Sequence, residues 1–524
     1  MTKHVDATNL SGERTTPWLD TTVPALHGAP AGDMRADVCI VGAGIAGMSV
    51  AYLLAREGKS VIVLDHGGVG SGETGRTTAH LSNVVDDRYT EMIRLHGKEG
   101  AHLAAESHTA AIDLIEAIVT AEQIDCDFVR VDGLLFLGQG DKVRLLEEEL
   151  EAARSVGLAD AGLLARVPLR GYEAGPCIRF PRQAQFHPLN YLSGLTRAIE
   201  RHGGRIYGNA HVTSVQGGSQ VRVETEGGPV ITANAAVVAT NSPINDLVIT
   251  HLKQTPWRTY VIAARVPRGT VTPALFWDTA KPYHYARLEY GPEATGDYDL
   301  LIVGGEDHRA GESDEEDQAL RWARLEQWAR THWPTMGKVI YRWSGQVMET
   351  IDGLAFIGRT PSGDPNVYIA TGDSGMGMTH GAIAGILLSD LILRGNHPWQ
   401  KLYDPLRLKL GAAMEMARAD AATAVAAVMG YVGAADVAST DDIASGEGAL
   451  VREGVSKIAA YRDQAGILSR YSAVCPHMGC IVEWNPGEKI WVCPCHGSRF
   501  DKYGRVVNGP ATSDLQPVLE PRDA

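Results

Sequence analysis

The sequence predicts an α/β fold that is followed by a small all-β module. A short apolar run, Asp37–Val41, leads directly into a glycine-rich turn and a helical pattern over Ile45–Arg56. A second apolar run, Val61–Asp65, completes a strand–helix–strand unit of about thirty residues. From Ala449 onward, short strand patterns alternate with glycine turns, which is typical of a small all-β domain. The 524 residues allow two to four domains at about 100–200 residues each.

The composition excludes several classes of protein. The chain has 63 acidic and 48 basic residues, so its formal net charge is −15. Because nucleic-acid binding needs a basic surface, we do not expect nucleic acid as a partner. No apolar run reaches the roughly 18 residues of a membrane span, and the polar N-terminal segment has no apolar core or arginine pair of a secretion signal. We therefore expect a cytoplasmic protein without an integral membrane segment.

The middle of the chain alternates between helical and strand-like patterns. The sequence pattern predicts helices in four segments and strands in three other segments. One further segment suggests a hairpin. Further strand-like runs occur between residues 256 and 304. The expected helices are Tyr89–Ile124, Leu189–His202, Glu312–Trp333 and Gly381–Leu393, the expected strands are Val221–Thr225, Val230–Thr240 and Asn366–Thr371, and the expected hairpin is Val129–Leu137.

The first glycine-rich turn, GAGIAG at 42–47, matches the pattern G-x-G-x-x-G. Because it follows a strand and opens a helix, it predicts a dinucleotide-binding unit of the Rossmann type. Gly42 permits the tight turn, Gly44 lets the backbone approach a pyrophosphate, and Gly47 allows close packing of helix and strand. The helix N-terminus offers free N–H groups to the phosphates, and Asp65, at the end of the next strand, can accept the ribose hydroxyls.

Two further segments favour FAD over NAD. A glycine- and threonine-rich loop at 66–81 is long enough to run along a diphosphate and reach an isoalloxazine ring. A second glycine-rich turn at 370–378 follows a strand and opens a helix, whose N-terminus would stabilise an anionic reduced flavin. We find no second G-x-G-x-x-G after a strand, so a separate NAD(P)H domain is not expected.

Over roughly residues 30–405 the chain resembles the D-amino-acid-oxidase-like FAD-dependent oxidoreductases. The matching stretches are DVCIVGAGIAG, ETGRTTAHL, ANAAVVATNSP, GLAFIGR and ATGDSGMGM. The resemblance implies a Rossmann-type FAD domain, an antiparallel-sheet substrate domain and non-covalently bound FAD, with His80 as the candidate catalytic residue near the flavin. The residues that it implies for FAD binding are Gly42, Gly44, Ile45, Ala46, Gly47, Asp65, His66, Thr74, Gly75, Arg76, Thr77, Thr78, Ala79, His80, Val212, Thr240, Asn241, Gly375, Met376, Gly377 and Met378.

The C-terminal segment carries a cluster of cysteine and histidine residues. The pairs Cys475/His477 and Cys493/His496 together offer two thiolates and two imidazoles, which is the ligand set of a Rieske 2Fe–2S cluster. Zinc is the alternative, because it also binds Cys and His at paired spacings, but it would leave Cys480, Cys495 and the surrounding CPCHGS sequence unexplained. A Rieske oxygenase would need a second, mononuclear iron. The helical His96, His102 and His108 do not share one face, and we expect them to be solvated.

Over roughly 449–520 the chain resembles the Rieske proteins of respiratory cytochrome bc complexes. The resemblance implies that Cys475 and Cys493 bind one iron, that His477 and His496 bind the other, and that a disulfide joins Cys480 to Cys495. It also implies that the turn at 509–511 covers the cluster and that Ser498 donates to a bridging sulfide. Phe500 stands where many high-potential members carry Tyr, so we expect a lower potential.

These patterns divide the chain into four parts. Residues 1–34 are an N-terminal arm, and residues 406–448 are an Ala-rich helix and linker. The weakly apolar stretch Ala421–Ala435 in that segment is expected to be a linker or packing helix, and a membrane-surface helix is the alternative. The oxidoreductase occupies 35–405, and the Rieske domain occupies 449–524. Within the oxidoreductase, the FAD-binding part covers roughly 35–90, 190–245 and 345–400, and the substrate part covers roughly 125–190 and 250–345.

The substrate part supplies candidate groups for chemistry. An Arg could anchor a substrate carboxylate, and a His or Tyr could take a proton from an amine or alcohol as hydride leaves. These candidates are Arg258, Tyr283, His284, Tyr285, Arg287, Asp307 and His308.

The leading functional hypothesis is a dehydrogenase that oxidises a small amine, amino acid or related substrate. Electrons would pass from FAD through the 2Fe–2S cluster to an external acceptor, either a protein or a quinone. One alternative is an oxidase that reduces oxygen directly, with a structural or regulatory cluster. The other is a redox sensor or electron carrier that is not an enzyme.

Overall fold

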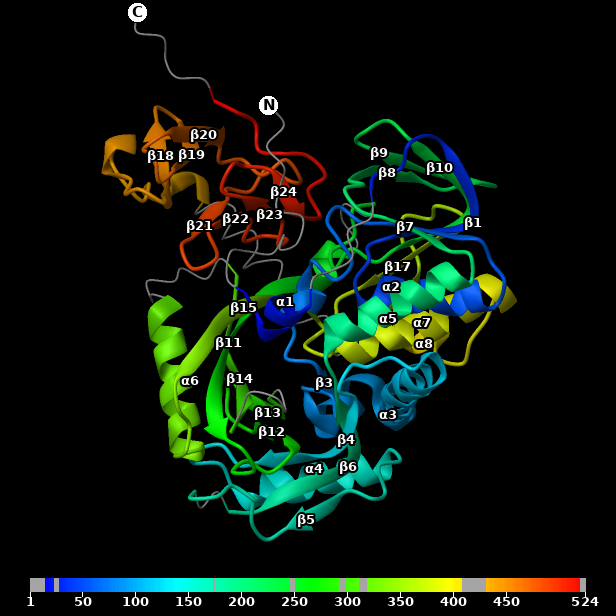
Figure 1. Ribbon diagram of the computed structural model, residues 1–524, viewed down its shortest axis with the longest axis vertical. Coiled ribbons are helices and arrows are strands. Elements are labelled where there is room, and N and C mark those ends of the chain that lie inside the picture. The colour runs from blue at the N-terminus through cyan, green and yellow to red at the C-terminus, as the bar shows by residue number, and fades with distance from the viewer. Residues whose placement is uncertain are drawn as a thin grey trace, which may run out of the picture.

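The computed structural model describes residues 15–22, 28–172, 175–245, 250–291, 297–310, 318–407 and 430–518. Two large sheets with their helices form the body of the molecule, and the C-terminal strands form a smaller lobe at one end (Figure 1). The expected helix at Ala421–Ala435 lies mostly outside the described residues. Among the helices that the structure describes, none is long and apolar enough to cross a membrane.

The first sheet has eight strands and carries the glycine-rich turn. Five of its strands are parallel, and the apolar runs of the two strands that flank the turn form its buried centre. The path runs β16 (Phe356–Arg359), β17 (Val367–Thr371), β10 (Val230–Val238), β1 (Met34–Val41), β2 (Val61–Leu64) and β7 (Arg205–Tyr207), with β9 (Val221–Thr225) and β8 (Val212–Gln216) attached to β10. Helices α2 (Ile45–Arg56), α5 (Pro188–Arg201) and α7 (Gly377–Arg394) pack beside one another against this sheet (Figure 1).

The second sheet has nine strands and provides the wall opposite the glycine-rich turn. Its path runs β15 (Val339–Thr350), β11 (Gln254–Pro267), β14 (Tyr298–Arg309), β13 (Tyr285–Glu289), β12 (Ala274–Asp278), β4 (Val129–Phe136), β6 (Cys177–Gln185) and β3 (His80–Leu81), with β5 (Gly162–Leu164) beside β6. Helix α6 (Gln318–His332) packs on β11 and β14, and α4 (Val143–Ser155) packs on α3 (Arg88–Glu122).

This second sheet corrects two expectations. It is mixed, because β4 lies parallel to β12, whereas the prediction was an antiparallel sheet. The expected hairpin at Val129–Leu137 is wrong, because β4 is one strand that pairs with β6 and β12. The pairing of β4 with β6 shifts register between Val131 and Gly133, so the strand carries a bulge there instead of a turn.

The described part of the N-terminal arm is folded against the body. Residues Pro17–Thr21 form the short helix α1, and Trp18 is fully buried. The Trp18 indole donates to the carbonyl oxygen of Thr77 at 2.7 Å, and its ring lies under the guanidinium of Arg287. The arm therefore supports the loop that leads to His80.

The C-terminal lobe consists of two small antiparallel sheets. One is formed by β18 (Glu447–Glu453), β19 (Ser456–Arg462) and β20 (Leu468–Ser472), and the other by β21 (Glu483–Asn485), β22 (Ile490–Val492), β23 (Arg499–Asp501) and β24 (Val506–Asn508). The lobe has its own core, in which Trp491 and Phe500 pack beside the four clustered cysteines. It is an all-β module, as expected.

Buried charges join this lobe to the body. Glu488, in the turn between β21 and β22, is fully buried and lies 3.1 Å from Nη1 of Arg76. The Glu488 carboxylate also accepts hydrogen bonds from the backbone N–H and the hydroxyl of Ser344, at 3.0 and 2.9 Å. Arg499, at the start of β23, pairs with Glu73. Burial alone would raise the pKa of Glu73, but Arg499 and Arg76 outweigh it and keep that pKa below its usual value.

Replacing Glu488 with Ala should destabilise the protein strongly, because it leaves the Arg76 guanidinium buried without its carboxylate. We expect the free energy of unfolding to fall by about 3–5 kcal/mol. Chemical denaturation of the FAD-loaded protein measures this change. The matched control is Glu148→Ala, which removes the exposed partner of Arg144 and should leave the unfolding midpoint nearly unchanged. Equal midpoints for the two variants would contradict the prediction.

Candidate functional site

One cavity of about 330 Å3 lies between the two large sheets. At one end it is lined by the glycine-rich turn and at the other by strands β11, β13, β14 and β15. Part of its wall comes from the C-terminal lobe, through Val506, Val507, Asn508, Gly509 and Ala511. The cavity is therefore assembled from both parts of the protein.

The glycine-rich turn has the geometry that its sequence predicts. Gly42 has a φ of +107°, and a side chain there would lie 2.3 Å from the carbonyl oxygen of Ala239. A side chain at Gly47 would lie 1.9 Å from the carbonyl oxygen of Gly42, so only glycine lets α2 approach the turn. The Asp65 carboxylate accepts from the backbone N–H of Ala43 at 2.7 Å and of Gly67 at 2.8 Å. These bonds hold it at the cavity wall, where it can face a ribose.

Most of the residues expected to bind FAD line this one cavity, although they come from five separate segments. Gly47, Gly75 and Ala79 are not among the residues that line it. The residues at the wall are Gly42, Gly44, Ile45, Ala46, Asp65, His66, Thr74, Arg76, Thr77, Thr78, His80, Val212, Thr240, Asn241, Gly375, Met376, Gly377 and Met378. A row of lining groups that begins at a helix N-terminus and continues to the second glycine-rich turn fits a long dinucleotide cofactor.

His80 lies at the cavity wall on β3. Its Nδ1 lies 3.1 Å from the hydroxyl of Thr78, and its Nε2 lies 3.4 Å from the carbonyl oxygen of Ala286. Burial, together with the nearby Arg287 guanidinium, lowers the pKa of His80 to about 3. The imidazole is therefore neutral at physiological pH. Its catalytic role stays a prediction.

The structure separates the candidate substrate residues into two groups. Tyr283, Tyr285 and Asp307 line the cavity, whereas Arg258, His284, Arg287 and His308 do not. Arg258 donates to the hydroxyl of Ser344 at 2.8 Å, next to the buried charges that join the two parts. Arg287 is fully buried and pairs with Glu289. Neither arginine is placed to anchor a substrate carboxylate.

Four residues at the cavity were missed by sequence reasoning. They are Asp86, Gln346, Glu349 and Asp373, from three different segments. Burial raises the pKa of Asp86 to about 7 and that of Asp373 to about 6. Only Asp373 lies within a recognised motif, the second glycine-rich turn. No local pattern could have brought the other three together.

The cysteine–histidine cluster has the arrangement of a 2Fe–2S site. Cys475 and Cys493 are buried free thiols, and the rings of His477 and His496 lie 5.0 Å apart. Both ring nitrogens of His477 and Nδ1 of His496 are buried without hydrogen-bond partners, as metal-binding imidazoles would be before loading. These four side chains fit the two-Cys, two-His ligand set.

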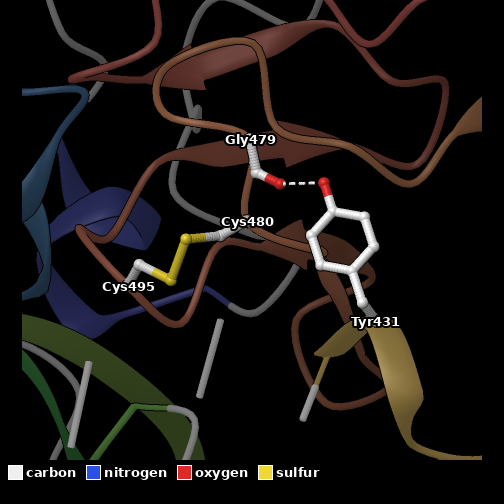
Figure 2. The surroundings of a disulfide bond; sticks show 4 residues. All are labelled: Tyr431, Gly479, Cys480 and Cys495. Carbon is white, nitrogen blue, oxygen red and sulfur yellow. Dashed lines mark hydrogen bonds between the residues drawn. A yellow bond between two sulfur atoms is a disulfide. The ribbon is translucent and has the colours of Figure 1, made fainter. Parts of the chain in front are cut away.

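A disulfide joins Cys480 to Cys495, as the resemblance implied (Figure 2). The sulfur of Cys493 lies within 4.8 Å of both disulfide sulfurs, so the bond clamps the two ligand loops together. Because these two sulfurs are bonded to each other, they do not serve as metal ligands. The hydroxyl of Tyr431 donates to the carbonyl oxygen of Gly479 at 2.6 Å and ties the first ligand loop to the segment before β18 (Figure 2).

The two candidate iron-binding histidines face the body of the protein. His251, which is buried and precedes β11, packs its ring 4.9 Å from that of His477 and 5.5 Å from that of His496. Gln346, which lines the cavity, donates through its side chain to the carbonyl oxygen of Gly497 at 3.2 Å. The residue next to His496 is thus in direct contact with the cavity wall.

The expectation of solvated histidines on α3 is wrong for two of the three. His102 is exposed, but His96 and His108 are buried. His96 contacts the carbonyl oxygen of Asp352 at 2.7 Å, and His108 contacts the hydroxyl of Thr379 at 2.8 Å. Because α3 packs against α7, polar side chains on that face are enclosed, and they find hydrogen-bond partners there.

Comparison with known families agrees with this site. Residues 37–391 match the family described as FAD dependent oxidoreductase, and residues 434–518 match the Rieske [2Fe-2S] domain. The chain belongs to the FAD dependent oxidoreductase family and carries a C-terminal Rieske domain. It is an enzyme of the oxidoreductase class, which excludes the sequence-based alternative of a carrier without enzymatic activity.

Individual relatives share parts or nearly all of this organisation. The chain is 32% identical over 492 residues to the putative Rieske 2Fe-2S iron-sulfur protein YhfW of Bacillus subtilis (strain 168). The matched region covers 93% of this chain and 94% of that protein. It is 30% identical to gamma-glutamylputrescine oxidoreductase of Escherichia coli (strain K12), over 69% of this chain and 84% of that protein. The crystal structure of glycine oxidase from Geobacillus kaustophilus has the same fold, with a TM-score of 0.60 and 20% sequence identity. The superposition covers 72% of this chain and 99% of the glycine oxidase chain.

Replacing Phe500 with Tyr should raise the reduction potential of the cluster. Phe500 is fully buried beside the cluster cysteines, and Ser498 Oγ accepts from the backbone N–H of Ala511 at 3.0 Å, which orients the Ser498 hydroxyl. A tyrosine hydroxyl would add a second donor toward the cluster and stabilise its reduced form. Redox titration of both proteins checks this shift. A wild-type potential as high as that of tyrosine-bearing Rieske proteins would contradict the prediction.

The stability of the protein should depend on the ionisation of Asp307. Burial raises the pKa of Asp307 to about 7, so the folded protein holds this proton over a pH range in which the unfolded chain has lost it. Stability from this group is therefore fully present below about pH 4 and is lost as pH rises through about 7. Thermal unfolding between about pH 5 and pH 8 should show a smaller decline in Asp307→Asn than in wild type, whereas the exposed Asp160→Asn should follow wild type. Parallel pH curves for all three proteins would contradict the prediction.

Proposed function

We propose that the protein is a dehydrogenase that oxidises a small amine or amino acid and passes the electrons through its own Rieske cluster to an external acceptor. Family membership establishes FAD-dependent oxidation and the Rieske domain. The observation that carries the rest is the docking of the cluster histidines against the body, next to the cavity wall. An oxidase that uses oxygen alone would have no need for this arrangement.

The contacts between the two parts form short routes. From His496, the chain continues to Gly497, whose carbonyl oxygen accepts from Gln346 in the cavity wall. From the two histidine rings, a second route runs through His251 to Gln254 three residues on, which contacts the hydroxyl of Thr371 at 3.1 Å. Thr371 also lines the cavity. Both routes consist of bonded or closely packed atoms.

The residues around the cavity have separable tasks. Bound FAD would accept a hydride from the substrate, and the cluster would accept electrons singly. The N-terminus of α2 and Asp65 would hold the phosphates and a ribose. His80 stays neutral, and the carboxylate of Asp86 or Asp307 can take a proton from the substrate nitrogen, because a pKa of about 7 suits a general base at neutral pH.

The C-terminal lobe also closes the cavity. Residues 506–509 and Ala511 form part of its wall. The carbonyl oxygen of Thr512 lies 2.9 Å from Nε2 of His211. Docking therefore limits the access of water to the reacting end of the cavity. We further propose non-covalent FAD and a cytoplasmic location, as the sequence suggested.

The test is an anaerobic reduction of the flavin alone. FAD in the purified holoenzyme is reduced by light and EDTA, and electron paramagnetic resonance then follows the appearance of the reduced Rieske cluster. We expect a rate that does not depend on protein concentration, because the transfer is internal. Gln346→Ala and His251→Phe should slow it, whereas Glu148→Ala should not. Failure of the cluster to become reduced overturns the proposal.

A second arm separates the proposal from direct use of oxygen. The double variant Cys475→Ser/Cys493→Ser lacks both thiolate ligands and should lose substrate-dependent reduction of an artificial acceptor. If it instead produces hydrogen peroxide from substrate at the wild-type rate, and wild type reduces no acceptor other than oxygen, the protein is an oxidase.

A further inference from the structure

The end of the cavity away from the glycine-rich turn is acidic. Four carboxyl groups line it, and we call them the acidic end: Asp86, Asp307, Glu349 and Asp373. They lie in the loop after β3, on β14, on β15 and in the loop after β17. A side chain at Gly375 would overlap Oδ2 of Asp86, so this carboxyl group lies directly against the second glycine-rich turn. The acidic end is therefore next to the expected position of the flavin.

Among the described residues, three of these carboxyl groups form a hydrogen bond with the protein, and the fourth does not. Asp86 accepts from the hydroxyl of Tyr283 at 2.8 Å, and Asp373 accepts from the backbone N–H of Met348 at 3.3 Å. The Asp307 carboxylate is hydrogen-bonded by Thr259, but its Oδ1 atom is buried and has no hydrogen-bond partner. The carboxyl group of Glu349 forms no hydrogen bond or ion pair within the part of the chain that the structure describes. Unpartnered buried acceptors of this kind call for a donor from a ligand.

The surrounding cations do not neutralise the acidic end. Arg76 is the one arginine or lysine among the described lining residues, and it is engaged by Glu488 and by the carbonyl oxygen of Ser344 at 2.9 Å. His284 and Arg321 act on Asp307 from outside the cavity, but His284 is itself held by Asp278 at 2.9 Å. Repulsion among the acids adds to burial, and both raise the pKa of Glu349.

Aromatic rings complete this end of the cavity. The ring centroids of Tyr283 and Tyr285 lie 5.4 Å apart. The rings of His80 and Tyr285 pack in a T-shaped arrangement, with their centroids 5.6 Å apart. Trp277 also lines the wall. Aromatic faces attract ammonium groups, and a site with rings and carboxylates but no free arginine favours cations over carboxylates.

We propose that the substrate is an amine with at least two basic nitrogens, such as an aliphatic diamine, and that it carries no carboxylate beside the oxidised nitrogen. One nitrogen would lie next to Asp86 or Asp307, and the other would be held by Glu349. This inference rests on the proposed function and narrows its substrate class from amines and amino acids to polycationic amines.

The reaction balances with the groups at hand. The substrate ammonium first loses one proton to a carboxylate of the acidic end. The C–H bond beside the nitrogen would then break, its hydrogen and electron pair would pass as hydride to bound FAD, which the established class of activity supplies, and the C=N bond of an iminium would form. The hydride carries away two electrons and one proton. The second nitrogen keeps its positive charge throughout.

Binding to the FAD-loaded full-length protein tests the proposal without turnover. The probes are 1,4-diaminobutane, n-butylamine, 4-aminobutanoate and alanine, followed by isothermal titration and by perturbation of the flavin spectrum under anaerobic conditions. We expect the diamine to bind at least about tenfold more tightly than butylamine, and the two carboxylate-bearing probes to bind more weakly than butylamine. Flavin bleaching should follow the same order.

Variants assign the preference to the acidic end. Glu349→Gln should reduce the preference for the diamine over butylamine by about tenfold. Asp307→Asn should reduce the same preference, and this variant provides the test if Glu349→Gln fails to fold. The control, Glu148→Gln on the surface of α4, should keep the preference. Tighter binding of alanine than of the diamine overturns the inference, as does an unchanged preference in both folded variants.

The two proposals can fail separately. If the diamine binds and bleaches the flavin while the cluster stays oxidised, the electron route is wrong and the substrate class stands. If photoreduced flavin reduces the cluster while no diamine binds, the electron route stands and the substrate class is wrong.

Discussion

The structure depends on a buried contact between opposite charges. Glu73 and Arg76, in the glycine- and threonine-rich loop at 66–81, meet Arg499 and Glu488 of the Rieske domain, with three of the four side chains almost fully enclosed. Charges removed from water are costly unless each is paired in good geometry, so this contact tolerates little displacement. It therefore sets the position of the lobe, and with it the orientation of the cluster histidines and the closure of the cavity.

Burial also decides the protonation of the groups around the cavity. His80 is held neutral, while the carboxyl groups of Asp86 and Asp307 are poised near neutrality. The same desolvation acts in opposite directions on the pKa of a base and of an acid, because it disfavours whichever form is charged. The cavity thereby combines a neutral imidazole with carboxyl groups that can exchange a proton at neutral pH.

Local motifs predicted much of the site. The strand–turn–helix at 37–56 requires glycine at Gly42 and Gly47, since no other residue fits the backbone there. The cysteine and histidine spacing likewise predicted the ligand pairs, and the resemblance to Rieske proteins implied the disulfide. Prediction failed where distant segments decide the outcome. The strand at Val129–Phe136 resembled a hairpin because its partners lie far away in the chain, and His96 and His108 resembled solvated residues because nothing local indicates that α7 covers them.

The sequence by itself determined the two cofactor sites, because each is written in one short segment whose backbone geometry or ligand spacing admits few alternatives. Only the tertiary structure decided which way the cluster faces and what charge the substrate end carries. Asp86, Asp307 and Glu349 are separated by up to hundreds of residues and share no pattern, yet packing of the two sheets brings them to one cavity. Proximity and burial arise from long-range packing, and these set both the contact between the cluster histidines and the body and the electrostatics of the cavity.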